Sequence, residues 1–343
     1  MPSHHFLYIL IYSVLFAFLS GCANITISHN TENDNTIKRL PKLTFAENEE
    51  FVVLVTGESD SLESLAEKYL GDKRKGWVIA DFNDIEKIVP KREIVIPLQS
   101  YNNPGVFTDG IQTIPILCYH RFGRGHAKLA VSEKSFKQQM QYLKDNNYNV
   151  IPMRAVYDFL QNKKPLPKKS VVITIDDGYR STYDIAFPIL KSLDFHATLF
   201  LYTDFTGARD AINWKQAKKM VESGYMDIQP HSKSHPNMSL KNIGETQKAY
   251  QTRIYEEIEN PGMKISRRLK YKMHTFAYPY GDTNEMIIAR LKKNDYKLGV
   301  TVHPGSNTAF SHPYMLQRTM IFGDHNMRDF INALDVFQDK NLK

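Results

Sequence analysis

Cysteine is scarce in this sequence: 343 residues contain only Cys22 and Cys118. We expect Cys22 to be modified, as argued below, which leaves Cys118 with no partner for an intramolecular disulfide, even in an oxidising compartment. Cys118 lies inside an apolar run, so we interpret it as a small core residue and not as a nucleophile. The scarcity of cysteine therefore excludes a fold held together by disulfides.

Long apolar runs are also lacking. The run at residues 6–19 is too short for a comfortable membrane span and has the character of a secretory signal. It leads into Leu19-Ser20-Gly21-Cys22, which resembles a bacterial lipobox. The resemblance implies that residues 1–21 are a lipoprotein signal peptide and that Cys22 is lipidated. Ala23 after the cysteine favours the periplasmic side of an outer membrane. No Lys or Arg precedes the run, so an uncleaved anchor remains an alternative.

A strong excess of one charge is missing as well. The chain has 44 Lys and Arg against 37 Asp and Glu, a net charge of +7, and its 42% hydrophobic and 24% charged residues are typical of a globular protein. The densest basic run, residues 264–272, suits a solvated helix face or loop. Attraction to an anionic envelope polymer or lipid surface remains open. Because the sequence contains no nucleic-acid-binding motif, we expect no nucleic acid partner.

The first hundred residues suggest a tether followed by a small module. Residues 22–48 are rich in Asn, Thr, Ser and charge, which predicts a flexible tether. Residues 49–99 then show a strand–helix–helix–strand pattern, with elements expected at 51–55, 62–70, 77–82 and 94–98. This βααβ unit resembles a LysM module, a fold that binds N-acetylglucosamine-containing glycans. A small docking domain without sugar affinity is the alternative.

Residues 100–111 contain Asn, Pro and Gly and predict a linker, so residues 112–343 form the second domain. That domain alternates apolar strands with amphipathic helices, which we expect at 133–146, capped by Ser132, at 214–222 and at 285–293. Such alternation favours a parallel sheet closed as a barrel, with a site at the carboxyl ends of the strands.

The stretch that organises this domain is a buried strand ending in two carboxylates. Residues 171–175 are all β-branched, and all but Thr174 are apolar, and Asp176-Asp177-Gly178 follows directly. Adjacent carboxylates repel each other and cost stability unless they share a cation or proton. An ordinary Asp-Asp-Gly turn is the alternative for this tripeptide alone.

Two histidines further along the chain point to the cation. His231 and His235 are separated by three residues, which can place both imidazoles on one side of a turn. Two imidazoles and one carboxylate leave open positions for water and substrate, as a catalytic metal site requires. Pro230 and Pro236 flank the pair and predict a rigid loop and not a long helix.

Three segments together resemble a known family. Residues 174–178, 231–235 and 278–281 resemble, in order, three motifs of the polysaccharide deacetylases, carbohydrate esterase family 4, over about residues 112–335. Leu117-Cys118-Tyr119-His120 precedes the Asp pair, as in the circularly permuted branch that deacetylates poly-N-acetylglucosamine. The resemblance implies an α/β fold of the distorted (β/α)7 barrel type, preceded here by the LysM-like domain.

The resemblance also implies roles for the motif residues. Asp176 is expected to be the general base and His120 the acid that protonates the departing amine. The cofactor is expected to be one divalent metal, with Zn²⁺ favoured and Co²⁺, Ni²⁺ or Fe²⁺ also compatible with the ligands. The resemblance assigns the metal site to Asp177, His231 and His235. It assigns the oxyanion and substrate site to Tyr280, through its backbone N–H, and to Tyr278.

One position departs from the family. Many members carry an Arg where Ala277 stands, and that Arg orients the base. Arg318, at the end of Leu316-Gln317-Arg318, is the expected substitute, with a surface or structural Arg as the alternative. His303 is the rival of His120 for the acid role.

These observations predict a metal-dependent hydrolase, anchored to the membrane through Cys22, that removes N-acetyl groups from a β-linked N-acetylglucosamine polymer. The permuted motif order favours exopolysaccharide of the poly-N-acetylglucosamine type. Deacetylation of peptidoglycan is the alternative, supported by the LysM-like module. A non-catalytic glycan-binding envelope lipoprotein is the alternative of another class. The sequence does not predict an oligomeric state.

Overall fold

A computed structural model describes residues 44–123 and 128–339. The expected signal peptide, the lipidation site Cys22 and the tether up to residue 43 lie outside the described residues. Within the described ranges, no helix combines the length and the apolar character needed to cross a bilayer.

The N-terminal module consists of a three-stranded antiparallel sheet and two helices. Its sheet order is β1-β2-β3. Its elements are β1 (Thr44–Glu47), β2 (Phe51–Val55), α1 (Leu62–Leu70), the short helical turn η1 (Lys73–Lys75), α2 (Gly76–Asn83) and β3 (Glu93–Pro97). They enclose a core of their own, made of Val52, Leu54, Leu65, Ala66, Ile79, Ile94 and Ile96. The observed elements agree with the βααβ order expected for residues 49–99.

Local signals define the ends of α1. Ser61 and Ser64 form a reciprocal capping box at its start, and Gly71 ends the helix with φ 68°. The tether predicted for residues 22–48 is too long at its C-terminal end, because β1 pairs with β2 there. A four-residue strand is specified by its pairing partner, and composition alone does not reveal it.

The second domain is built around parallel strands. β5 (Ile114–Tyr119), β9 (Ser170–Ile175), β10 (Ala197–Leu201) and β11 (Met226–Pro230) are hydrogen-bonded in the order β11-β10-β9-β5. Strands β5, β9 and β10 are buried along their whole length, as their apolar runs predict. Because the four strands are parallel, their carboxyl ends all lie at the same edge of the sheet.

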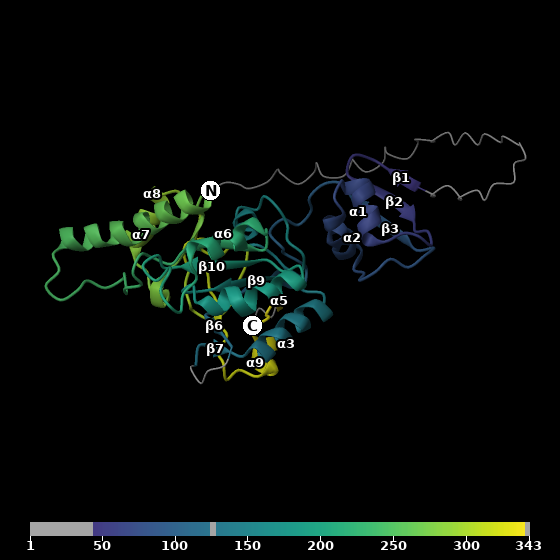
Figure 1. The fold of residues 1–343 in the computed structure, drawn as a ribbon. Helices are drawn as coiled ribbons and strands as arrows, with labels where there is room; N and C mark the ends of the chain where they lie inside the picture. The colour runs from purple at the N-terminus through teal and green to yellow at the C-terminus, as the bar shows by residue number, and fades with distance from the viewer. Residues whose placement is uncertain (1–43, 124–127, 340–343) are drawn as a thin grey trace, which may run out of the picture. The chain divides into compact units, whose positions relative to one another are not determined.

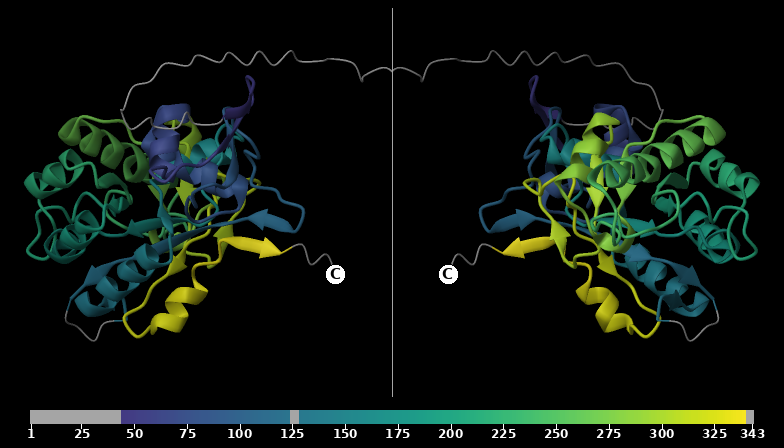
Figure 2. Two further views of the ribbon diagram at one scale, coloured as in Figure 1. Left: turned by 90° about the vertical axis from the view of Figure 1, so that its right-hand side faces the viewer. Right: turned by 90° about the vertical axis from the view of Figure 1, so that its left-hand side faces the viewer.

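Three further strands close the ring. β12 (Thr275–Ala277) pairs in parallel with β13 (Leu298–Val300), and β15 (Thr319–Met320) pairs in parallel with β5. An isolated parallel bridge between Val300 and Leu316 joins β13 to the segment before β15. These seven strands, with helices around them in Figure 2, form the distorted (β/α)7 barrel that the family resemblance implied.

The distortion lies between β11 and β12, which share no ladder among the described strand pairs. The Gln229 side chain takes its place: its Oε1 accepts hydrogen bonds from the backbone N–H of His274 at 2.9 Å and of Thr275 at 3.1 Å. The fully buried side-chain amide of Gln229 thus replaces the backbone hydrogen bonds that would otherwise join β11 to β12.

Helices cover the outside of the barrel. α7 packs against β11, α6 and α8 (Figure 1). The predicted helix after Ser132 is confirmed, with Ser132 Oγ accepting from Ser135 N. The helices are α3 (Glu133–Asp145), α4 (Met153–Leu160), α5 (Phe187–Ser192), α6 (Trp214–Glu222), α7 (Gln247–Leu269), α8 (Glu285–Lys293) and α9 (Met327–Asn332), with a π-helical turn η2 (Thr182–Ala186) and a 3-10 turn η3 (Pro279–Gly281).

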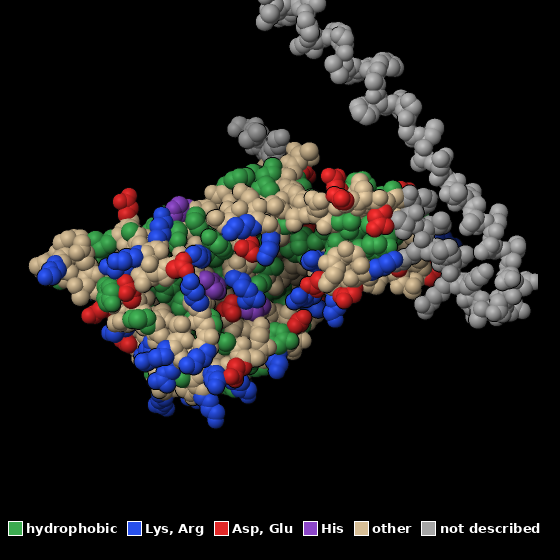
Figure 3. Space-filling view, turned by 90° about the horizontal axis from the view of Figure 1, so that it is seen from above, with side chains coloured by type: hydrophobic (Ala, Val, Ile, Leu, Met, Phe, Trp, Pro, Cys, Tyr) green, Lys and Arg blue, Asp and Glu red, His purple; other side chains and the backbone are tan. Residues whose placement is uncertain are grey.

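Short strands complete the domain. They are β4 (Gly110–Gln112), β6 (Arg121–Phe122), β7 (Ala130–Val131), β8 (Asn149–Val150), β14 (Ser306–Asn307) and β16 (Phe337–Asp339). β4 pairs with β16, so the two ends of the domain lie side by side (Figure 2). The predicted linker 100–111 therefore ends in a strand of the second domain. Basic and acidic side chains are interspersed on the face shown in Figure 3, in agreement with the scattered charge of the sequence.

Candidate active site

The Asp176-Asp177-Gly178 segment is a tight turn at the carboxyl end of β9. Asp177 and Gly178 have φ angles of 74° and 88°, in the left-handed region. A Cβ on Gly178 would lie 2.3 Å from Leu201 Cδ1, and together with the positive φ angle this favours glycine. Asp176 N donates to the carbonyl of Tyr119 at 2.8 Å, which ties the turn to the end of β5. Both carboxylates are buried, at 1% and 7% exposure.

Arg318 holds the first carboxylate. Its guanidinium donates from Nη1 to Asp176 Oδ1 at 2.7 Å and from Nη2 to Oδ2 at 2.8 Å, while Nε donates to the carbonyl of Thr301. Burial opposes ionisation, yet Arg318 and His231 hold the pKa of Asp176 well below its usual range. Arg318 thus occupies the position expected of the substitute for Ala277, and Ala277 itself is fully buried.

Asp177 and the two histidines converge on one point. Asp177 Oδ1 lies 3.5 Å from His235 Nε2 and 3.7 Å from His231 Nε2, and one ligand atom from each residue lies within 4.8 Å of the others. Ligand atoms about 2 Å from one ion are separated by roughly 3 to 3.5 Å. The three residues therefore fit a single divalent cation with open positions on its far side.

The protonation states suit ligation. Burial raises the pKa of Asp177 to about 6 and lowers the pKa of His231 to about 3, and it also lowers the pKa of His235. Both imidazoles are thus neutral near pH 7. His231 Nδ1 lies 2.9 Å from the carbonyl of Ala277, which fixes the tautomer that donates there and leaves Nε2 free to ligate.

A strained loop presents His235. Ser232 and His235 have positive φ angles of 70° and 63°, which non-glycine residues adopt at a cost. Ser232 Oγ accepts a hydrogen bond from His235 N at 2.9 Å across the loop. The prediction of a rigid loop in place of a helix is confirmed.

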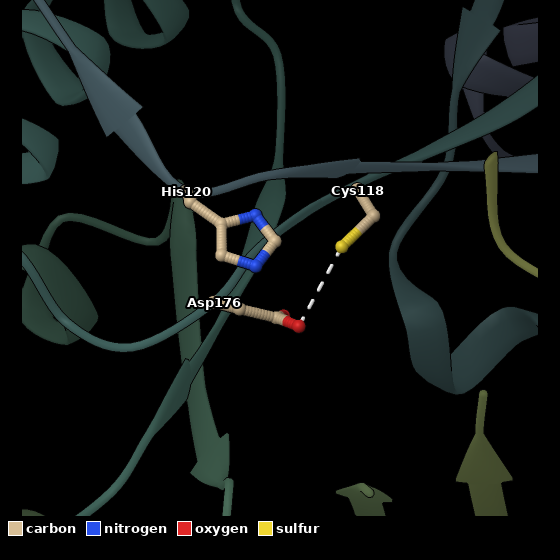
Figure 4. A group of neighbouring side chains, drawn as sticks. All are labelled: Cys118, His120 and Asp176. Carbon is tan, nitrogen blue, oxygen red and sulfur yellow. Dashed lines mark hydrogen bonds between the residues drawn. The ribbon is translucent and has the colours of Figure 1, made fainter. Parts of the chain in front are cut away.

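His120 lies beside Asp176, the expected general base. It follows β5 directly, is 9% exposed, and its ring stands beside the Asp176 carboxylate in Figure 4. Its Nδ1 is buried and has no hydrogen-bond partner within the described part of the chain. The rival His303 is exposed, and its backbone carbonyl accepts from Arg318 N. The geometry therefore brings His120, and not His303, next to the base.

Cys118 supports the base without being reactive. Its Sγ donates to Asp176 Oδ2 at 3.5 Å (Figure 4). Burial raises the pKa of the Cys118 thiol, so it stays protonated. Cys118, His120 and Asp176 form a second group close enough to share a cation. Because Arg318 occupies both Asp176 oxygens and the thiol keeps its proton, the Asp177 group fits a metal better.

The third motif forms one wall of the site. Tyr280 has φ 61° within η3, and its ring, 61% exposed, meets the His235 ring at a centroid distance of 4.9 Å. A Cβ on Gly281 would lie 2.6 Å from Val302 N, so glycine is needed after this turn. Tyr278 corrects a prediction: it is fully buried, and its hydroxyl donates to the carbonyl of Tyr314 at 2.9 Å. Its side chain is part of the hydrophobic core of the barrel.

The sequence reasoning missed an aromatic edge beside His235. Tyr202 lies with its ring centroid 5.3 Å from that of His235, Phe205 stacks on Tyr202, and Tyr179 meets Phe205 edge-on. Two of these residues could have been found, because Tyr179 follows the Asp-Asp-Gly turn and Tyr202 follows β10. Such faces suit the apolar faces of sugar rings.

The buried side chain of Glu257 was missed as well. It lies on α7 and contacts the loop between His231 and His235. Its signal in the sequence is a Glu on the stripe that Ile254, Ile258 and Ile265 define.

The arrangement can activate water and protonate a leaving group. It joins an ionised buried carboxylate, three metal-ligand side chains and an imidazole within one site. This combination suits the hydrolysis of an amide bond.

Sequence comparisons identify similar proteins. The sequence model of a family described as polysaccharide deacetylase matches residues 163–299. A Bacillus subtilis protein assigned to the polysaccharide deacetylases, YxkH, is 31% identical over 210 residues, which cover 61% of this chain and 71% of that protein. The poly-β-1,6-N-acetyl-D-glucosamine N-deacetylase of Staphylococcus aureus is 29% identical over 217 residues, covering 62% and 74% of the two chains.

Solved structures agree with this likeness. The Streptococcus pyogenes deacetylase PplD, solved in complex with acetate, is 28% identical with a TM-score of 0.60, covering 65% of this chain and 98% of that chain. IcaB from Ammonifex degensii is 23% identical with a TM-score of 0.58, covering 65% and 96%, a similarity that bears on the fold alone.

Proposed function

Because this chain belongs to the polysaccharide deacetylase family, and is therefore a polysaccharide N-deacetylase, we propose that its substrate is a β-linked N-acetylglucosamine polymer of the poly-N-acetylglucosamine type. The observation that supports metal-assisted hydrolysis of the polymer is the buried Asp176, ionised by Arg318, beside the ligand set of Asp177, His231 and His235. A module that only binds glycan has no need of such a set.

The residues of the site divide the work. A divalent cation, when bound, polarises the acetamide carbonyl and makes water more acidic. Asp176 takes up the proton of the attacking water, and Arg318 keeps that carboxylate aligned and ionised beforehand. His120 gives a proton to the departing amine from the opposite side. The backbone N–H of Tyr280 is the donor assigned to the developing oxyanion.

Two observations favour poly-N-acetylglucosamine as the polymer. His120 precedes the Asp pair in the chain, which is the motif order of the permuted branch. The Staphylococcus aureus relative is named for poly-β-1,6-N-acetyl-D-glucosamine. Peptidoglycan is the second candidate, because the βααβ module of residues 49–99 resembles a glycan-binding LysM fold.

Acetate release by the full-length chain tests the choice of polymer. A β-1,6-linked N-acetylglucosamine pentamer and purified peptidoglycan are compared at equal N-acetyl concentration with Zn²⁺ present. We expect kcat/KM to be higher on the pentamer. A higher value on peptidoglycan would replace the proposed substrate with the second candidate. Release from neither polymer, by a folded and metal-loaded chain, would overturn both.

The proposal extends to the envelope. Cys22 and the lipobox-like Leu19-Ser20-Gly21 lie outside the described residues and carry the expectation of a lipid anchor, on the periplasmic side of an outer membrane. The anchor would keep the barrel next to a polymer that passes through the envelope.

A further inference from the structure

Helix α7 carries one carboxylate on its buried face. The other buried residues of that face are Tyr250, Ile254, Ile258, Pro261, Gly262 and Ile265. Glu257 lies among them and is only 5% exposed. Glutamate is almost never buried without a partner, because desolvation of its charge costs several kcal/mol. The position therefore needs an explanation other than packing.

The partners of Glu257 all belong to the metal loop, defined here as residues 231–235. Glu257 Oε2 accepts the backbone N–H groups of both Lys233 and Ser234 at 2.9 Å, and Oε1 accepts the Ser234 hydroxyl at 2.7 Å. Within the described ranges Glu257 forms hydrogen bonds and no ion pair with Lys or Arg. All three of these hydrogen bonds are thus directed to the two residues before His235.

The metal loop needs such a support. Two of its residues, Ser232 and His235, have positive φ angles, a backbone form that is less stable for these residues than an extended or helical one. The bond between His235 N and Ser232 Oγ closes the loop, and Asp204 N, after β10, donates to the carbonyl of Lys233 at 2.9 Å on the barrel side. The three bonds to Glu257 connect the loop to a 23-residue helix that packs on β11.

We propose that Glu257 is a positioning residue that holds the metal loop in its strained form and so places His235 for ligation. This inference rests on the proposed function, since it takes Asp177, His231 and His235 as the metal ligands. The hydrogen bonds of Glu257 go to Lys233 and Ser234 and to none of the three ligand side chains. It acts through the backbone of Lys233 and Ser234.

The test measures the affinity of the full-length chain for Zn²⁺ alone, by competition with a chromophoric chelator. Glu257→Leu suits the apolar stripe but leaves the N–H groups of Lys233 and Ser234 without this acceptor. We expect it to weaken Zn²⁺ binding by about 10- to 100-fold, as loss of an outer-shell support does. The absorption of bound Co²⁺ should change with it, because the position of His235 alters the ligand field. Activity at saturating Zn²⁺ should recover.

Conservative and control variants separate positioning from stability. In Glu257→Gln the amide oxygen can still accept both N–H groups and the amide can donate to Ser234 Oγ, so most of the Zn²⁺ affinity should return. Glu256→Leu removes the neighbouring exposed charge and should leave affinity unchanged. A Glu257→Leu chain that melts at a lower temperature but binds Zn²⁺ as tightly as the original would overturn the proposal.

A variant outside the core covers the case in which Glu257→Leu fails to fold. Ser234→Ala removes one of the three bonds and should weaken Zn²⁺ binding measurably with an unchanged melting temperature; unchanged affinity would contradict the inference. A different result would contradict the proposed function. A chain that binds Zn²⁺ through Glu257-dependent loop geometry but releases no acetate from either polymer would leave the positioning role intact.

Discussion

At the scale of single residues, the site depends on one buried ion pair. Arg318 and Asp176 are exposed by 0% and 1%, and they meet through two parallel hydrogen bonds. A buried pair of this kind is expensive to desolvate and adds little net stability, so its retention points to chemistry. The bidentate contact both orients the base and keeps it ionised.

Arg318→Lys should separate these two effects. Lysine keeps the charge but offers no planar fork, so one charge-assisted bond, worth about 1.5–3 kcal/mol, is lost, and kcat should fall roughly 10- to 100-fold. The folded-state pKa of Asp176 is depressed, and weakening its partner raises that pKa. The ionised base is then lost at a higher pH, so the acidic limb of the kcat/KM profile should move upward. An unmoved limb would exclude Arg318 as the group that tunes the base.

The residue scale also shows what the sequence can predict. Motif spacing was sufficient to bring Asp177, His231 and His235 together, because strand ends of one sheet meet at one edge. It could not tell which tyrosine of residues 278–281 faces the site. Tyr278 points inward, where its hydroxyl donates a hydrogen bond to the carbonyl of Tyr314, 36 residues further along the sequence. Contacts of that kind exist only in the folded chain.

At the scale of elements, a side chain and an isolated bridge connect neighbouring barrel strands that share no ladder of backbone hydrogen bonds. Gln229 is fully buried and bridges β11 to β12 through two backbone N–H groups, while the Val300–Leu316 bridge continues the ring beyond β13. The ends of β11 and β12 carry His231 and Tyr280. The junction therefore sets the distance between the metal loop and the third motif.

Gln229→Leu should open this junction. Two backbone N–H groups lose their acceptor, each at about 1–3 kcal/mol, so the free energy of unfolding should fall by roughly 2–6 kcal/mol. Urea denaturation of the variant beside Gln251→Leu, an exposed position on α7, measures the effect. Equal stability of the two variants would show that the bridge contributes nothing.

Periodicity predicted some helices to the residue and missed the longest. The expected helices at 214–222 and 285–293 are found as α6 and α8, and residues 133–146 as α3 with one residue fewer. α7 was not predicted, because Pro261 and Gly262 stand in its middle and normally end a helix. Burial of its apolar stripe on the barrel outweighs the lost backbone bond, a tertiary effect that local pattern cannot reveal.

At the scale of the whole molecule, the sequence predicts an anchor at one end of the chain and a catalytic domain at the other. The βααβ module has its own core, and the barrel has two larger ones. Whether the module binds glycan depends on its surface and not on its fold, so its resemblance to LysM remains a prediction. The anchor is a prediction of the same kind.

Cys22→Ser tests the anchor. Without a thiol the lipid cannot be attached, so the chain should move from the membrane fraction to the soluble fraction, with its activity on soluble oligomers unchanged. Cys118→Ser serves as the matched control, because the buried Cys118 should have no effect on fractionation. A Cys22→Ser chain that stays with the membrane would favour the uncleaved anchor of residues 6–19.

The most direct test of the central claim is acetate release from the β-1,6-linked N-acetylglucosamine pentamer during a Zn²⁺ titration of the metal-free, full-length chain. The account predicts no release without metal, full activity at one equivalent of Zn²⁺, and a loss of roughly 10²- to 10⁴-fold in Asp176→Asn, which still binds Zn²⁺. Undiminished activity in the metal-free chain, or in Asp176→Asn, would contradict it.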